Sequence, residues 1–188
     1  MKKVSDILPY FLNELLDFYP ENEIKSIMYI SIDFHLGLTK SGTILQSERI
    51  LKDEEISVFI NIVDRLQKME PIQYILSETK FHGLSFHTKK GILIPRPETE
   101  ELVDWIIKDN QGSEKKYLDI GTGSGCIIIS LAKNLKGTFD AIDISEKSIR
   151  ISEENSTKNK VNINLKQKDI LHSELKGEWD IIVSNPPY

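Results

Sequence analysis

The chain has 188 residues, of which 39% are hydrophobic, which is enough for one domain, or for a small domain joined to a medium one, with a sizeable core. The net charge of −5 argues against a protein whose main task is to coat nucleic acid, because phosphate neutralisation supplies most non-specific affinity. The single cysteine, Cys126, excludes an internal disulfide framework, and no histidine is spaced to form a zinc site with it, so no metal site is expected.

Apolar residues recur at helical spacing from Val4 to Met69, a pattern that predicts a small helical bundle whose apolar stripes pack into a core. Asp53 precedes the last of these stripes and is expected to cap the third long helix. Gly37 and the pair Ser41-Gly42 are expected to separate the earlier helices, because glycine and serine favour turns.

Short alternating segments replace the helical pattern between Thr79 and Ile94. Phe81, Leu84 and Phe86 precede Lys89-Lys90-Gly91 and the apolar run 92–94 follows it, so we expect a β-hairpin that turns at this tripeptide and links two domains. The predicted organisation is a helical domain over residues 1–76, a hairpin linker over residues 77–96 and a further domain over residues 97–188.

Strands and helices alternate from Lys116 onward. Predicted strands cover residues 117–120, 138–144, 162–167 and 180–184, with a glycine loop after the first strand and helices after the first two. Alternation of this kind predicts a parallel sheet with helices on both faces, which is an α/β fold of the Rossmann-like type.

The first candidate site is the run Asp119-Ile120-Gly121-Thr122-Gly123-Ser124-Gly125, which leaves a strand and enters a helix. Glycines there let a ligand approach the backbone closely, although a tight turn without a ligand would also use them. A dinucleotide-binding loop needs its third glycine where this chain has Cys126, so a nicotinamide cofactor is disfavoured. An acid followed by alternating glycines instead looks like the first motif of class I methyltransferases, which binds the amino-acid end of S-adenosyl-L-methionine. The cofactor contacts predicted from it are Asp119, Gly121, Thr122, Gly123, Ser124 and Gly125.

Two more acids stand at or just after the ends of predicted strands. Asp143 can accept hydrogen bonds from both hydroxyls of a ribose, and we prefer this role to helix capping because Ser145 stands at the better cap position. Asp169 resembles the acid that lies beside the adenine in class I methyltransferases. Capping of the segment 170–175 explains Asp169 equally well, so both interpretations stay open.

The chain then reaches Asn185-Pro186-Pro187-Tyr188, directly after an apolar strand. An amide nitrogen is a poor nucleophile because its lone pair is delocalised, so an enzyme that methylates it must fix its geometry. The Asn185 side-chain oxygen and the Pro186 carbonyl can accept hydrogen bonds from the two N–H groups of such an amide. Pro187 keeps that carbonyl rigid, and Tyr188 can stack on the planar group. We predict a nitrogen-methylation site here, with a plain proline turn as the alternative.

These motifs and the run Ile94-Pro95-Arg96-Pro97-Glu98-Thr99-Glu100 resemble the protein N5-glutamine methyltransferases of peptide-chain release factors, the PrmC/HemK family. The resemblance is close from about Pro71 to Tyr188, whereas residues 1–70 match only in character. It implies a helical domain that helps hold a release factor, and a catalytic domain that methylates the glutamine of its Gly-Gly-Gln motif.

The roles that the resemblance implies fall on named residues. The glycine loop, Asp143 and Asn185 would bind S-adenosyl-L-methionine, Asn185 to Tyr188 would bind the glutamine, and Ile170 would contact the adenine. The family's catalytic domain continues past this motif to a seven-stranded sheet, so we expect a truncated domain with only the first four strands, in the order 3-2-1-4. An exposed fourth strand would favour self-association, and we expect weak cofactor binding with slow methyl transfer or none.

Two other functions fit the same residues. Adenine N6 methyltransferases of DNA or RNA use a similar Asn-Pro-Pro-Tyr element and would bring a flipped base to Tyr188, but the acidic balance disfavours direct nucleic-acid binding. A truncated, non-catalytic module that docks a release factor through the helical domain is the other alternative. Apolar runs are too short to span a bilayer and no signal peptide is evident, so we expect no membrane partner and a cytoplasmic location.

Overall fold

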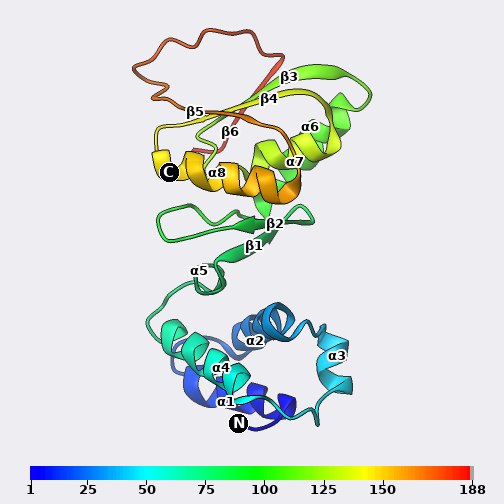
Figure 1. The fold of residues 1–188 in the computed structure, drawn as a ribbon, viewed down its shortest axis with the longest axis vertical. Helices are drawn as coiled ribbons and strands as arrows, with labels where there is room; N and C mark the ends of the chain where they lie inside the picture. Colours follow the sequence, from blue (N-terminus) through cyan, green and yellow to red (C-terminus); the bar gives the residue numbers. More distant parts are fainter. Residues whose placement is uncertain (187–188) are drawn as a thin grey trace. The chain divides into compact units, whose positions relative to one another are not determined.

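Figure 1 shows the computed structural model, which describes residues 1–186. The chain divides into two compact units, one over Met1–Leu76 and one that begins at Ser77. The first unit is helical. It contains the 3-10 helix η1 (Val4–Asp6) and the helices α1 (Ile7–Leu15), α2 (Glu21–Leu36), α3 (Lys40–Leu45), α4 (Asp53–Leu66) and α5 (Ile72–Leu76).

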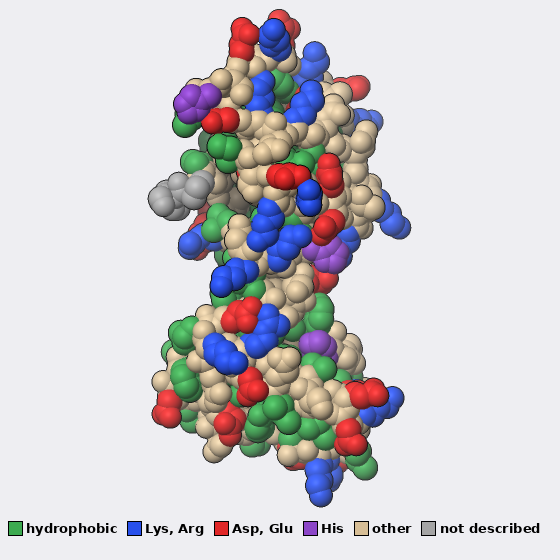
Figure 2. All heavy atoms as spheres, turned by 60° about the vertical axis from the view of Figure 1, so that its left-hand side comes forward, with side chains coloured by type: hydrophobic (Ala, Val, Ile, Leu, Met, Phe, Trp, Pro, Cys, Tyr) green, Lys and Arg blue, Asp and Glu red, His purple; other side chains and the backbone are tan. Residues whose placement is uncertain are grey.

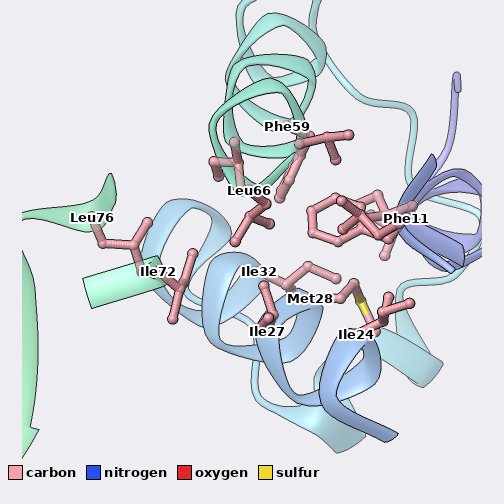
Figure 3. Packing of buried hydrophobic residues seen from close by; sticks show 14 of the residues in the cluster. Phe11, Ile24, Ile27, Met28, Ile32, Phe59, Leu66, Ile72 and Leu76 are labelled. Atoms are coloured by element: carbon pink, nitrogen blue, oxygen red, sulfur yellow. The ribbon is translucent and has the colours of Figure 1, made fainter. Parts of the chain in front are cut away.

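Helices α1, α2, α4 and α5 share one apolar core in the helical unit (Figure 3). Phe11 of α1 and Phe59 of α4 are fully buried there, and their ring centroids lie 6.3 Å apart in an edge-to-face arrangement. Helix α2 adds Ile24 and Met28, which are spaced to lie on one helical face. The bundle predicted from helical spacing is therefore confirmed.

The structure corrects two details of the predicted helix ends. Asp53 is the first residue of α4 rather than its cap, and the Glu55 carboxylate accepts a hydrogen bond from the Lys52 N–H (2.9 Å). The pair Ser41-Gly42 lies inside α3 and does not separate helices. Gly37 does end α2, with the left-handed φ of 64° that glycine adopts readily.

The second unit is an α/β domain. Its elements are β1 (Glu78–Phe81), β2 (Leu84–His87), α6 (Glu98–Asn110), β3 (Glu114–Ile120), α7 (Cys126–Asn134), β4 (Lys136–Asp143), α8 (Glu146–Asn159), β5 (Asn164–Gln167) and β6 (Ile181–Ser184). Four strands form a parallel sheet in the order β5-β4-β3-β6, which confirms the predicted order 3-2-1-4.

The helices of this unit lie on one face of the sheet. The crossovers β3-α7-β4 and β4-α8-β5 step in the same direction, and right-handed connections therefore place α7 and α8 on the same side. Helix α7 packs against both α6 and α8. The prediction of helices on both faces is wrong for residues 1–186, because the segment 168–180 between β5 and β6 contains no helix.

The hairpin of β1 and β2 turns at His82-Gly83, and not at Lys89-Lys90-Gly91 as predicted. Both turn residues have positive φ, 48° for the histidine and 71° for the glycine, as two-residue hairpin turns of this kind require. Residues 92–94 form no strand. The hairpin belongs to the second unit, where it packs on α8 and Asn159 Nδ2 donates to the Ser85 carbonyl (3.0 Å).

The surface shows no separation of charge on the face drawn in Figure 2, where acidic and basic side chains are mixed and hydrophobic side chains are exposed between them. Leu45 of the helical unit, for example, is 86% exposed. Residues 1–186 contain no helix that is long and apolar enough to cross a membrane.

Candidate functional site

A cavity of about 540 Å³ lies at the carboxyl ends of β3, β4 and β6. Ligands of open parallel sheets bind at this edge, and the volume is typical of small-molecule sites. The predicted site residues that line it are Gly121, Thr122, Gly123, Ser124, Asp143, Asp169, Ile170, Asn185 and Pro186. Asp119 and Gly125 are not among the residues that line it in the described part of the chain. Pro187 and Tyr188 lie outside the described residues.

The glycine loop leaves open space on the cavity side. Gly121 and Gly123 have left-handed φ values of 75° and 57°, and a Cβ added at either residue would meet no atom within 4 Å. Gly125 differs, because a Cβ there would lie 2.8 Å from Ile129 Cδ1. The first two glycines therefore border space that a ligand can fill, whereas the third is required by packing inside the protein.

Hydrogen bonds from neighbouring elements hold this loop in place. The Gly121 N–H donates to the Ile142 carbonyl of β4 (2.9 Å), and Ser152 Oγ of α8 donates to the Gly123 carbonyl (3.0 Å). Thr122 Oγ1 donates to the Asp119 carboxylate (2.7 Å). The loop is thus fixed by the protein itself, as a preformed binding site requires.

Helix α8 buries a polar residue that joins the loop to the hairpin. Asn155 is fully buried, and its Nδ2 donates to the carbonyls of Ser124 (2.9 Å) and His87 (3.1 Å). Its Oδ1 accepts a hydrogen bond from the His87 N–H (2.6 Å). The single side chain of Asn155 therefore fixes both the glycine loop and the end of β2.

Two titratable groups beside the loop are buried. Burial raises the pKa of Asp119 to about 7, although the hydrogen bond from Thr122 opposes this shift. Burial also raises the pKa of the Cys126 thiol to about 12, so this cysteine is not a thiolate nucleophile at neutral pH. The Asp119 carboxylate accepts a hydrogen bond from Thr122, and Asp119 does not line the cavity in the described part of the chain. Its contact with the cofactor therefore stays a prediction.

Asp143 lies at the end of β4 and lines the cavity. One of its carboxylate oxygens accepts from the Gly123 N–H (2.9 Å), and the other accepts from the Ser145 N–H (2.8 Å). Helix α8 is capped by Ser145, whose Oγ accepts from the Ser148 N–H (3.3 Å). An ionised carboxylate can accept about four hydrogen bonds, so Asp143 keeps acceptor capacity for a ligand.

Asp169 and Ile170 line the cavity beyond the end of β5. The Asp169 carboxylate accepts from the Leu171 N–H (2.9 Å) and contacts His172 Nδ1 (2.8 Å), and the bond from His172 lowers the pKa of Asp169. This local turn explains Asp169 without a ligand, while its place in the cavity wall also fits a contact with adenine.

Asn185 directly follows β6 and lines the same cavity as the glycine loop. Its Nδ2 donates to Thr99 Oγ1 (3.1 Å) in the first turn of α6. The preceding residue, Ser184, donates through Oγ to the Ile120 carbonyl (2.8 Å), so the end of β6 is tied to the end of β3. Asn185 is thus held by α6, and the strand before it by β3, at the carboxyl edge of the sheet.

Among the residues of the cavity wall that sequence reasoning missed are Thr99, Ile144 and Leu171. Ile144 and Leu171 are 64% and 84% exposed, so both leave apolar surface open at the cavity. Ile144 directly follows Asp143, and Leu171 lies two residues after Asp169. An apolar residue this close to a predicted site acid could have been predicted to line the cavity.

Two family models match the chain. Residues 98–188 match the model described as "Methyltransferase small domain", and residues 19–76 match "PrmC N-terminal domain". The parallel sheet, the glycine loop at its edge and the first match define the second unit as a methyltransferase domain of the class that uses S-adenosyl-L-methionine.

Curated relatives give the particular family. The release factor glutamine methyltransferase of Flavobacterium psychrophilum is 45% identical over 95% of this chain and 65% of its own length. Those of Bacteroides thetaiotaomicron and Streptococcus pneumoniae are 42% and 37% identical, over 98% and 99% of this chain and 67% and 66% of their own lengths. The chain therefore belongs to the release factor glutamine methyltransferase family, and it spans about two thirds of the length of these relatives.

Proposed function

We propose that the chain transfers a methyl group from S-adenosyl-L-methionine to the side-chain amide nitrogen of the glutamine in the Gly-Gly-Gln motif of a peptide-chain release factor. The observation that carries this proposal is the position of Asn185. It lines one cavity together with Gly121, Gly123 and Asp143, so an amide acceptor and the residues suited to an adenosyl cofactor face the same space. The names of the relatives support the choice of a release factor as substrate.

The residues of the cavity fit the cofactor. The open space beside Gly121 and Gly123 suits its amino-acid end, since a side chain at either glycine would occupy that space. The spare acceptor capacity of Asp143 suits the two ribose hydroxyls. Ile170 and the exposed Ile144 supply apolar surface for the adenine ring.

The substrate amide is oriented by the protein in this proposal. The bound cofactor supplies a methyl group on a positively charged sulfur atom. Asn185 Oδ1 and the Pro186 carbonyl accept hydrogen bonds from the two N–H groups of the glutamine amide. These bonds fix the direction from which the amide nitrogen meets the methyl group. These acceptors also stabilise the positive charge that develops on the nitrogen as its bond to the methyl group forms and the sulfur–methyl bond breaks. S-adenosyl-L-homocysteine is the leaving group, and the methylated nitrogen loses one proton to water.

A methyl-transfer assay tests the proposal. Purified release factor and duplex DNA are incubated in parallel with the chain and with cofactor that carries a tritiated methyl group. We expect slow incorporation of label into the release factor, and none in a release-factor variant whose Gly-Gly-Gln glutamine is replaced by glutamate. Label in DNA alone would favour the adenine N6 alternative and refute the proposal.

Calorimetry separates catalysis from simple docking. We expect S-adenosyl-L-methionine to bind the chain in an isothermal titration, because the loop and Asp143 are held in place by the protein. A folded chain that binds release factor but no cofactor would instead support the non-catalytic alternative.

A further inference from the structure

Thr99 contacts Asn185 although the two residues lie 86 positions apart in the chain. Thr99 is only 8% exposed, and its Oγ1 accepts a hydrogen bond from Asn185 Nδ2 at 3.1 Å. We propose that Thr99 is a positioning residue, which holds the Asn185 carboxamide in place for the substrate. The inference rests on the proposed function, in which Asn185 accepts an N–H of the glutamine amide.

The orientation matters because a carboxamide has two ends of similar shape and opposite hydrogen-bonding character. With Nδ2 bound to Thr99, the oxygen of Asn185 is left to accept a hydrogen bond from a ligand. The reversed carboxamide would point its own N–H groups at those of the glutamine, and one buried donor would then lack an acceptor. The Thr99 hydroxyl can accept from the amide end or donate to the oxygen end, so the contact fixes where the carboxamide stands, and the two N–H donors of the substrate select the oxygen end.

Both partners stand on anchored elements. The Thr99 N–H donates to the Arg96 carbonyl (3.0 Å) at the start of α6. The next residue, Glu100, accepts from the N–H of His82 in the hairpin turn (2.9 Å), so the first turn of α6 is held from a second side. A site side chain that is fixed by a partner on rigid elements keeps its geometry better than one held by a loop.

Helix capping does not account for the Thr99 hydroxyl. Pro97 occupies the cap position of α6, and no side chain caps this helix among the described residues. Carboxylates in the first turn of α6, among them Glu98 and Glu100, already complement the helix dipole beside Thr99. The hydroxyl is instead directed to Asn185 and shares its cavity.

Matched substitutions test the inference. Thr99→Val removes the hydroxyl at almost constant shape, Thr99→Ser keeps it, and Thr88→Val is the control. Thr88 is 1% exposed, and its Oγ1 has no hydrogen-bond partner within the described residues, so Thr88→Val removes no hydrogen bond there. We expect Thr99→Val to lower kcat for the release factor about tenfold, as expected for the loss of one well-placed hydrogen bond. Its Kd for S-adenosyl-L-methionine should change less than twofold.

The conservative variant and the control separate positioning from folding. Thr99→Ser should retain most of the activity, and Thr88→Val should match the wild type. Equal losses in the serine and valine variants would overturn the inference, as would an unchanged kcat in Thr99→Val. A cofactor Kd that rises as much as kcat falls would also overturn it, because Thr99 would then serve the cofactor.

Nuclear magnetic resonance gives a readout that needs no turnover. The side-chain NH₂ signals of Asn185 are identified by their loss in Asn185→Asp. They should shift in Thr99→Val and stay in place in Thr99→Ser. If the wild type methylates no release factor, the proposed function fails, whereas unshifted signals in Thr99→Val would refute the Thr99 contact itself.

Discussion

Removal of the buried Asn155 side chain should destabilise the second unit more than its small size implies. Asn155 makes hydrogen bonds with the His87 N–H, the His87 carbonyl and the Ser124 carbonyl. Each bond contributes roughly 1 kcal/mol net, so Asn155→Ala should lower the free energy of unfolding by about 3 kcal/mol. This is a large share of the 5–15 kcal/mol that is usual for a domain.

Tryptophan fluorescence in urea measures the unfolding of the second unit, which contains Asn155. Both tryptophans of the chain, Trp105 and Trp179, lie after Ser77, so their signal follows the second unit alone. With a denaturant slope of about 2 kcal/mol/M, the expected loss moves the urea midpoint down by about 1.5 M.

Asn134→Ala is the matched control. Asn134 is exposed, and its Nδ2 donates only within α7, to the Ser130 carbonyl (2.8 Å). Its midpoint should stay within about 0.3 M of the wild type, because surface substitutions of this kind are usually almost neutral. If Asn155→Ala shifts the midpoint no further than Asn134→Ala, the bridging role of Asn155 is refuted.

Three further predictions follow from the described contacts. Asp143→Ala should weaken S-adenosyl-L-methionine binding at least about tenfold by calorimetry, because hydrogen bonds to a charged group are lost; an unchanged Kd would exclude the ribose role. The stabilisation from protonated Asp119 is complete below the unfolded-state pKa near 3.8 and is lost as pH rises through about 7. The stability of the wild type relative to Asp119→Asn should thus fall by up to about 4 kcal/mol from pH 4 to pH 8 in urea titrations, and a flat difference would contradict the raised pKa. Phe59→Ala should cost the helical unit about 3–5 kcal/mol by far-ultraviolet circular dichroism, whereas Phe18→Ala, at a 44% exposed position, should cost much less.

The sequence predicted the sheet because its signals are local. The glycine loop after one strand and the strand-helix alternation depend on neighbouring residues, and they predicted the parallel sheet and the glycine-loop residues of the cavity. The order β5-β4-β3-β6 was expected from the family resemblance. The hairpin turn was missed because His82 has φ 48°, a conformation that few residues other than glycine adopt. The helix expected on the second face is absent from the described residues, because the segment 168–180 has a short turn at residues 170–172 and otherwise no regular secondary structure.

The contacts that support the candidate site could not be predicted in the same way. Asn155 stands on a helix, where a polar residue ordinarily indicates a solvent-facing side. Only the packed structure shows that this side is buried against the hairpin and the glycine loop. The contact of Thr99 with Asn185 likewise joins residues far apart in the chain, so no local pattern announces it.

The separation of Asn155 and His87 along the chain affects the order in which their contacts can form during translation. These residues are 68 positions apart, so the hairpin leaves the ribosome well before α8 does. Until α8 is made, the His87 backbone groups lack their asparagine partner, and the strand edge of β2 is open to pairing with other chains. Translation of α8 therefore supplies the hydrogen-bond partner of both the end of β2 and the glycine loop, and a pause just before it would leave both without that partner.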